Sequence, residues 1–169
     1  MSSRADETPQ ERWAEATEFV RDSKITLLSA VIAARAECPT GTPFRARISR
    51  HHPAHAFEVL FLAEDRKQVV RVEIDAICGE PLAADDDEPM PAKDIAALAV
   101  FAAHGSDALE ASLRRAAKLN RGTPIGAELR ERKKAPPIVA VTLLTPTGIR
   151  EILVAPADER PVHLVRRSE

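Results

Sequence analysis

Residues 57–82 read FEVLFLAEDRKQVVRVEIDAICGEPL, and the rest of the chain is organised around this stretch. Residues 57–63 and 68–75 place apolar side chains at alternate positions, a pattern typical of β-strands. Glu64-Asp65-Arg66-Lys67 lies between them and is polar throughout, so we expect a turn joining two antiparallel strands. The stretch closes in Asp75-Ala-Ile-Cys-Gly-Glu80, which contains the Asp and Gly that turns favour.

Two predicted helices and one strand precede this hairpin. Thr8-Pro-Gln-Glu11 has a capping threonine, a proline at the first helical position and a glutamate three places later, so it predicts a helix over 9–21. A second helix is expected over 25–37, because its apolar residues form a broad stripe of Leu27, Leu28, Val31, Ile32 and Ala34. Residues 44–50 alternate and predict the first strand. We expect Phe57, Val59 and Phe61 to face the second helix.

The second half of the chain repeats the first at an offset of 81 residues. Gly41-Thr-Pro-Phe44 matches Gly122-Thr-Pro-Ile125, Leu28 matches Leu109, and Leu62 matches Leu143 without a gap. The predicted elements also recur in the same order, with helices over 93–104 and 107–119 and strands over 125–131, 138–144 and 149–155. A short edge strand is expected over 162–165. Self-similarity of this kind indicates internal duplication.

These patterns predict an α+β fold of two tandem repeats, each with helices packed on a three-stranded antiparallel meander. We divide the chain into an N-terminal helix (1–24), a first repeat (25–84), an acidic, proline-containing linker (85–92), and a helix with the second repeat (93–169). The linker contains Asp85-Asp86-Asp87-Glu88. Four carboxylates suit calcium, but calcium loops alternate their ligands, so we interpret the cluster as a solvated linker.

The ending Ile74-Asp-Ala-Ile-Cys-Gly-Glu-Pro-Leu82 resembles that of the PepSY domain family: an apolar residue, Asp-Ala, two variable residues, Gly and an acidic or polar residue. Positions 25–82 match the family well, whereas 107–164 match in pattern and lack the Asp-Ala and the Gly. PepSY domains occur in propeptides of thermolysin-type peptidases, where they inhibit or chaperone the enzyme. The resemblance implies a non-catalytic binding or regulatory module, with a peptidase or another protein as its partner.

Composition narrows the partners and the compartment. The chain has five Phe, one Trp and no Tyr, so a stacking platform for nucleic acid is not expected. Its two cysteines form no Cys-x-x-Cys pair, and no apolar run reaches the length of about 18 residues that spans a bilayer. The first ten residues have no apolar core of a secretory signal. We expect a cytoplasmic protein, or an extracytoplasmic one if a leader has been removed.

Three histidines are the candidate metal ligands. His51, His52 and His55 are concentrated in one connection, and histidine nitrogens suit zinc, copper or nickel. Pro53 constrains them, and we interpret the segment as a solvated turn. No phosphate-binding loop, H-E-x-x-H or G-x-S-x-G motif is present, so we expect neither a cofactor nor catalysis.

Three apolar residues are the candidate binding surface. Leu60, Leu62 and Val69 alternate with the residues that should face the helix, so they belong to the opposite face of the sheet, where polar residues are the rule. A second layer should therefore cover them. The helix over 9–21, the other repeat, a homodimer or a protein partner are the alternatives. A competing function is a ligand-binding protein or enzyme with a cavity between the two repeats.

Overall fold

The computed structural model describes residues 7–50, 55–65, 68–86, 92–102, 107–119, 121–132, 135–155 and 163–165. Within these ranges the helices are α1 (Pro9–Asp22), α2 (Leu27–Glu37), α3 (Ala92–Ala102) and α4 (Ala108–Lys118). The strands are β1 (Thr42–Ile48), β2 (Ala56–Leu62), β3 (Val69–Asp75), β4 (Pro81–Asp86), β5 (Thr123–Arg132), β6 (Ala135–Thr145), β7 (Gly148–Val154) and β8 (His163–Val165). The expected α+β class is confirmed.

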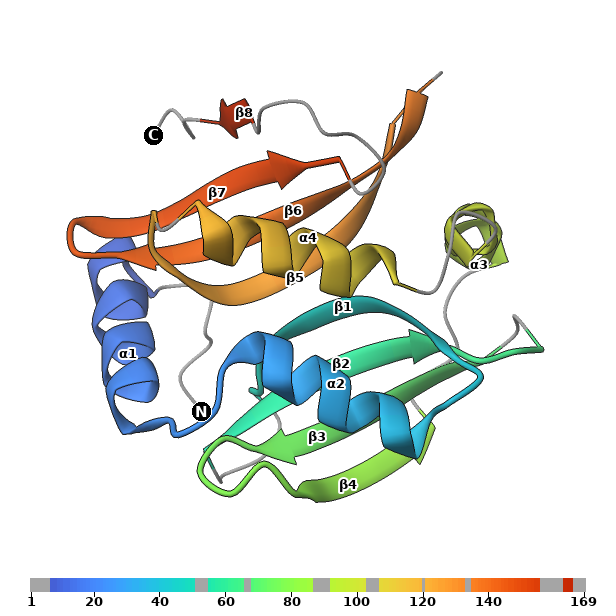
Figure 1. Ribbon diagram of the computed structural model, residues 1–169, viewed down its shortest axis with the longest axis horizontal. Coiled ribbons are helices and arrows are strands. Elements are labelled where there is room, and N and C mark those ends of the chain that lie inside the picture. The colour runs from blue at the N-terminus through green and yellow to red at the C-terminus, as the bar shows by residue number, and fades with distance from the viewer. Residues whose placement is uncertain are drawn as a thin grey trace.

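All of these strands form one antiparallel sheet in the order β4-β3-β2-β1-β5-β6-β7-β8. Each half is a meander of consecutive strands, and β1 and β5 join the two meanders at the centre of the sheet (Figure 1). The short edge strand expected over 162–165 is present as β8, which pairs with β7. The expectation of three strands is wrong for the first meander, because the unexpected strand β4 pairs with β3. The added strands satisfy backbone groups that β3 and β7 would otherwise leave open at the sheet edges.

Strand β4 also changes the interpretation of the acidic segment. We expected a linker over 85–92, but Asp85 and Asp86 belong to β4, where they pair with Arg71 and Val70 of β3. The acidic, proline-containing composition favoured a linker. The segment forms a strand because its backbone pairs with the open edge of β3. Residues 87–91 lie outside the described ranges, and so do two of the four carboxylates considered for calcium.

Three helices cover one face of the sheet. α2 contacts β1, β2 and β3, α4 contacts β5, β6 and β7, and α2 and α4 contact each other. α1 connects the two halves, since Trp13 Nε1 donates to the Thr145 carbonyl at 3.1 Å and the Phe19 ring meets the Phe57 ring edge-on at 5.0 Å. A row of paired core residues crosses the sheet beneath these helices: Val72, Val59, Ala46, Ala127, Val141 and Ile152.

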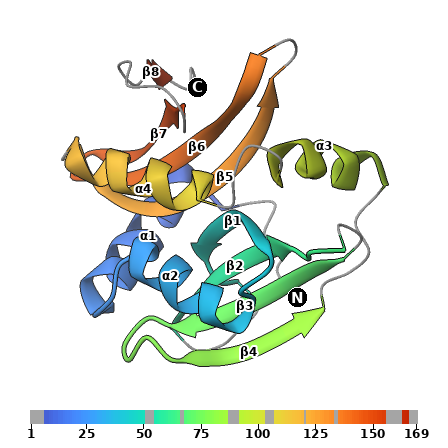
Figure 2. The same ribbon diagram turned by 45° about the vertical axis from the view of Figure 1, so that its right-hand side comes forward.

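The fourth helix lies apart from this layer. Figure 2 shows α3 separated from α1, α2 and α4. α3 contacts β2, and its Ile95 and Leu98 pack against the hydrophobic core. No helix in the described part of the chain is long and apolar enough to cross a membrane.

Local chemistry accounts for the element ends that the sequence predicted. The capping box at α1 is present, with Glu11 N donating to Thr8 Oγ1 at 3.3 Å and Thr8 N donating to Glu11 Oε2 at 2.7 Å. The turn after β3 is held by Asp75, whose Oδ1 accepts from the backbone N–H of Ile77 and of Cys78. Gly79 has φ +78°, a left-handed conformation that favours glycine. At α4, Asp107 and Glu110 have the sequence spacing of a capping box, but the Asp107 side chain makes no capping hydrogen bond.

Two further expectations are wrong by a small shift: the buried side of α2, and the alignment of the two halves beyond their first strands. Ile32 is 45% exposed, because the buried residues of α2 are Leu27, Ala30, Val31 and Ala34. The ungapped match at 81 residues holds for Ala46 and Ala127, which pair directly with each other, but not for the next strands. Thr42 pairs with Leu62, and Thr123 pairs with Leu144, so Leu62 corresponds to Leu144 rather than Leu143. Loop lengths shift the register, and a one-residue shift exchanges the faces of a strand.

Candidate functional site

The histidine connection is only partly described. His51 and His52 lie outside the described residues. The His55 ring stacks on Phe19 at 3.9 Å, and its Nε2 lies 2.8 Å from the Phe19 carbonyl oxygen and 3.1 Å from Ser23 Oγ. These contacts connect the start of β2 to the end of α1 and engage Nε2, one of the two ring nitrogens that could bind a metal. The described residues contain no group of three or more His, Cys, Asp or Glu side chains placed to hold a metal ion.

The apolar trio on the second face is buried within the chain. Leu60, Leu62 and Val69 are 4%, 2% and 3% exposed. We named the helix over 9–21 or the other repeat as the internal cover, but α1 contacts β6 and β7. α3 contacts β2, and its Ile95 and Leu98 pack against the core cluster that contains Leu60, Leu62 and Val69. At this burial the three side chains offer a partner almost no accessible surface.

The part of this face that α3 leaves uncovered is called here the helix-free face. It carries charged side chains on the central strands of the sheet. Two rows of paired residues cross this face. One row consists of Glu73, Glu58, Arg47, Gly126, Thr142 and Glu151, and the other of Arg71, Leu60, Arg45, Glu128, Ala140 and Leu153. Alternation along each strand predicts that these residues face away from the helix-covered core. It does not predict that arginines and glutamates from the two halves lie side by side.

The first half contributes a buried carboxylate shared by two arginines. Glu58 is 1% exposed and accepts from Arg47 Nε at 2.6 Å, while Arg71 Nε lies 3.5 Å from its other oxygen. Glu73, the next residue of this row, accepts from Ser49 Oγ at 2.5 Å. A buried carboxylate is tolerated only when it is paired, so Glu58 depends on its arginines.

Two more ion pairs stand at the junction and in the second half. Arg45 of β1 bonds Glu128 of β5, with Nε at 3.0 Å from Oε1, and this pair connects the two meanders. Arg130 of β5 reaches over β6 to Glu151 of β7 with two parallel hydrogen bonds of 2.8 Å. This bidentate geometry is the strong form of an arginine–carboxylate pair.

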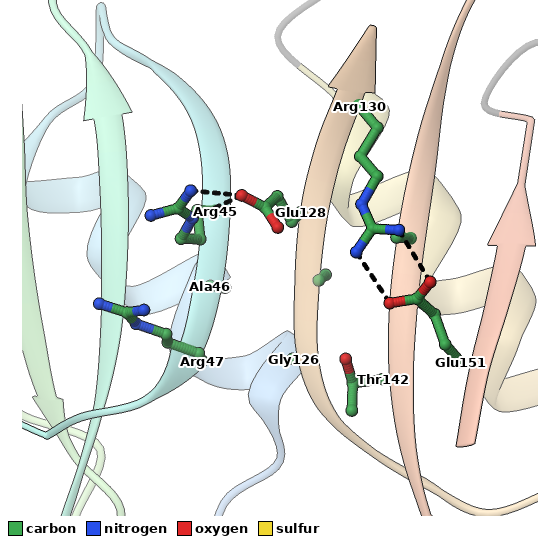
Figure 3. Close-up of a pocket in the computed structure, with 10 residues that line it drawn as sticks. Arg45, Ala46, Arg47, Gly126, Glu128, Arg130, Thr142 and Glu151 are labelled. Carbon is green, nitrogen blue, oxygen red and sulfur yellow. Dashed lines mark hydrogen bonds and ion pairs between the residues drawn. The ribbon is translucent and has the colours of Figure 1, made fainter. Parts of the chain in front are cut away.

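A hollow of about 250 Å³ lies between these two ion pairs. Figure 3 shows Arg45 and Glu128 on one side of it, Arg130 and Glu151 on the other, and Gly126 and Thr142 between them. Because β1 and β5 both line it, the hollow draws on both halves of the chain. No motif in the sequence predicted this site, although a glycine inside a strand, such as Gly126, can mark close approach by another group.

The described residues offer no catalytic set at this hollow. Its polar groups are arginines, glutamates held in ion pairs, and one threonine. Burial raises the pKa of the Cys38 thiol, which is the opposite of what a reactive thiolate needs. Asp75 has a lowered pKa because it accepts hydrogen bonds from the backbone of Cys78 and Ile77, in agreement with its predicted structural role. The arrangement is suited to binding.

Comparison with known proteins gives one similar structure. No family model and no curated protein matches the chain. The crystal structure of a "putative lipoprotein" from Clostridium difficile 630 matches with a TM-score of 0.48 and 12% sequence identity, over 86% of this chain and 96% of that one.

Proposed function

We propose that this protein is a non-catalytic binding module of the PepSY-like type, and that the charged, helix-free face of its sheet contacts a polypeptide partner. The observation that carries the proposal is that charged side chains of both meanders meet on this face. Arg45 and Arg47 of β1, Glu128 and Arg130 of β5, and Glu151 of β7 line one hollow, whereas Glu58 and Glu73 of the same face are buried. Such a surface gives specificity through charge complementarity.

The edges of the sheet are poorer docking sites than this face. β4 begins with a proline and ends with Asp85 and Asp86, and β8 is three residues long. Proline, charged residues and short length are the features by which edge strands avoid pairing with another chain. The partner is therefore expected on the face.

The tandem arrangement supports the PepSY-like interpretation. We infer that the two halves are copies of one unit, a helix followed by a four-stranded meander. Ala46 and Ala127 lie 81 residues apart and pair with each other, so the axis that would relate the copies passes between β1 and β5. Arg45 and Glu128 straddle this axis. Placing a site at such a junction lets both copies contribute to it.

A library of random decapeptides displayed on phage and selected against the whole chain tests the proposal. Peptides recovered are then measured by fluorescence anisotropy against Arg45→Ala and Arg130→Ala. We expect each variant to weaken binding about tenfold, which corresponds to about 1.4 kcal/mol. Arg114→Ala on α4 is the matched control, because this arginine is also exposed and ion-paired but lies on the helix layer. Recovered peptides that lose no more affinity to the face variants than to the control would contradict the proposal.

A peptidase partner is tested directly. The chain is added to a thermolysin-type metallopeptidase, and hydrolysis of a fluorogenic peptide is followed. We expect inhibition that Arg45→Ala and Arg130→Ala weaken. Unchanged hydrolysis at all concentrations would remove peptidases of this type as partners, while binding of other polypeptides would remain open to the display experiment.

The hollow favours a second candidate function, in which a small ligand binds between the two halves. It has residues of β1 on one side and of β5, β6 and β7 on the other. A screen of small charged metabolites by thermal shift tests this candidate, since a ligand that binds only the folded state raises the melting temperature.

A further inference from the structure

The two central rows differ at one position of β5. On the helix-free face, Arg45 of β1 stands directly opposite Glu128 of β5 and bonds it. Two residues along β1, Arg47 stands directly opposite Gly126, which has no side chain. The cation–carboxylate pairing across β1 and β5 is therefore complete in one row and lacks its carboxylate in the next.

Neither backbone conformation nor crowding requires glycine at position 126. Among the described residues, the glycines with positive φ are Gly79, Gly122 and Gly148. A Cβ built on Gly126 would lie 3.4 Å from Cβ and Oγ1 of Thr142 and 3.7 Å from the Ala46 carbonyl oxygen, which are ordinary contacts. What the glycine does is keep open the hollow of about 250 Å³ above it.

Among the residues that line the hollow, cations outnumber carboxylates by one. Its lining includes the cations Arg45, Arg47 and Arg130 and the carboxylates Glu128 and Glu151. Arg47 extends toward β2 and bonds Glu58 through Nε, but Glu58 also serves Arg71. Glu73 lies three strands from Gly126, roughly 14 Å at the usual strand spacing.

A hydroxyl donor completes the surroundings. Thr142 pairs with Gly126 on the side away from Arg47, and Figure 3 shows its hydroxyl oxygen directed into the hollow. Within the described residues this hydroxyl has no protein hydrogen-bond partner. A group seated above Gly126 has the Thr142 hydroxyl close by on one side, since Thr142 Oγ1 lies 3.4 Å from a Cβ built on this glycine. Arg47 is on the other side, with its guanidinium extended toward β2 and Glu58 (Figure 3).

We propose that the hollow above Gly126 is a subsite for one carboxylate, supplied by an acidic side chain of an extended polypeptide that lies across β1 and β5. This inference rests on the proposed function and adds the chemistry that the face recognises. The incoming carboxylate takes the place of the side chain that Gly126 lacks, accepts from Thr142 Oγ1, and pairs with the guanidinium of Arg47. Charge-assisted hydrogen bonds of this kind are the stronger ones in protein recognition.

The first test needs no ligand. Gly126→Glu supplies the carboxylate within the chain, and Gly126→Gln supplies the same volume without the charge. We expect Gly126→Glu to melt about 2 °C higher than Gly126→Gln at pH 7 and low salt, with the difference lost in 1 M salt. An equal or lower melting temperature for Gly126→Glu would overturn the assignment of the hollow to a carboxylate.

The second test uses the peptide Ac-Thr-Val-Glu-Val-Thr-NH2, its Gln counterpart and sodium acetate. Binding is followed in two-dimensional NMR through the backbone amides of Gly126, Arg47 and Thr142. We expect the Glu peptide to bind at least fivefold more tightly than the Gln peptide, and Gly126→Gln to abolish the difference. Gly126→Ala is the matched control and should keep it, because one methyl leaves most of the hollow open.

The outcomes separate this inference from the proposed function. Equal binding of the Glu and Gln peptides at these amides would keep peptide binding on the face and overturn the carboxylate subsite. Acetate binding as tightly as the Glu peptide would assign the subsite to small carboxylates and overturn the polypeptide source. Absence of any shift with the Glu peptide at millimolar concentration would count against both.

Discussion

The two faces of the sheet bury different kinds of side chain: apolar ones under the helices, and ion-paired charged ones on the opposite face. Under α1, α2 and α4, the paired row through Val59 and Val141 is apolar and fully buried. On the other face, Glu58 is equally buried, at 1% exposed, but depends on Arg47 and Arg71. The apolar face gains stability from any side chain of suitable volume, whereas the charged face is stable only as a set of matched partners. This makes the charged face the more specific surface.

Leu60→Asp gives the largest expected effect, because it places a charge where the second face is apolar and covered. Leu60 is 4% exposed and pairs with Arg45 and Arg71 on either side. We expect a loss of at least about 5 kcal/mol from the lost apolar burial and the buried charge, enough to disrupt folding. Circular dichroism and size-exclusion chromatography check this.

A folded monomer of Leu60→Asp that has lost only a binding partner would reverse this expectation. It would mean that α3 does not stay over β2 and that the trio Leu60, Leu62 and Val69 is the binding surface after all. Normal stability together with normal association would leave these residues without either role.

Phe61→Ala measures the helix-covered face at the neighbouring residue of the same strand. Phe61 is 0% exposed, and its loss should cost about 3–5 kcal/mol in the free energy of unfolding. Urea denaturation gives the value. Ile32→Ala is the matched control on α2, since Ile32 is 45% exposed and should change stability by about 0.5 kcal/mol or less. Similar losses in both variants would mean that α2 packs in a different rotation.

Glu58→Ala tests whether the fold depends on the pairing of Glu58 with Arg47 and Arg71. Removal of the carboxylate leaves Arg47 and Arg71 close together without their shared acceptor, so we expect a loss of about 2–3 kcal/mol. A triple variant with Glu58, Arg47 and Arg71 all replaced by Leu should lose less than Glu58→Ala alone, because the uncompensated charges are gone. Equal losses in both variants would show that the ion-pair cluster is not an interdependent set.

The turn at Asp75 gives the smallest effect and a pH dependence. The pKa of Asp75 is lowered because its carboxylate accepts hydrogen bonds from the backbone N–H of Cys78 and Ile77. A carboxylate with a depressed folded-state pKa adds stability above its unfolded pKa, and the contribution is lost as pH falls through the folded pKa. The stability difference between wild type and Asp75→Ala should therefore be full at pH 7 and vanish at strongly acid pH. A difference that does not change between these limits would assign the effect to the turn backbone alone.

How much of the fold was predictable depends on how local the deciding interactions are. The capping box at Thr8 and the turn from Asp75 to Glu80 were predicted because their hydrogen bonds join residues a few positions apart. The strands of the 57–82 hairpin were predicted because alternation is a property of the chain itself. The strand β4 was missed, because its proline and aspartates favour a linker, and only pairing with the open edge of β3 makes this segment a strand.

At the candidate site, the difference between what local sequence predicts and what long-range pairing decides is larger still. The sequence by itself determined which residues of β1 point away from the core, including Arg45 and Arg47, because a strand exposes alternate residues. Only the tertiary structure decided that β1 would lie beside β5, about 80 residues away, with Arg45 opposite Glu128 and Arg47 opposite Gly126. Pairing register between distant strands depends on how two whole meanders pack under their helices, and no periodicity along one chain encodes it.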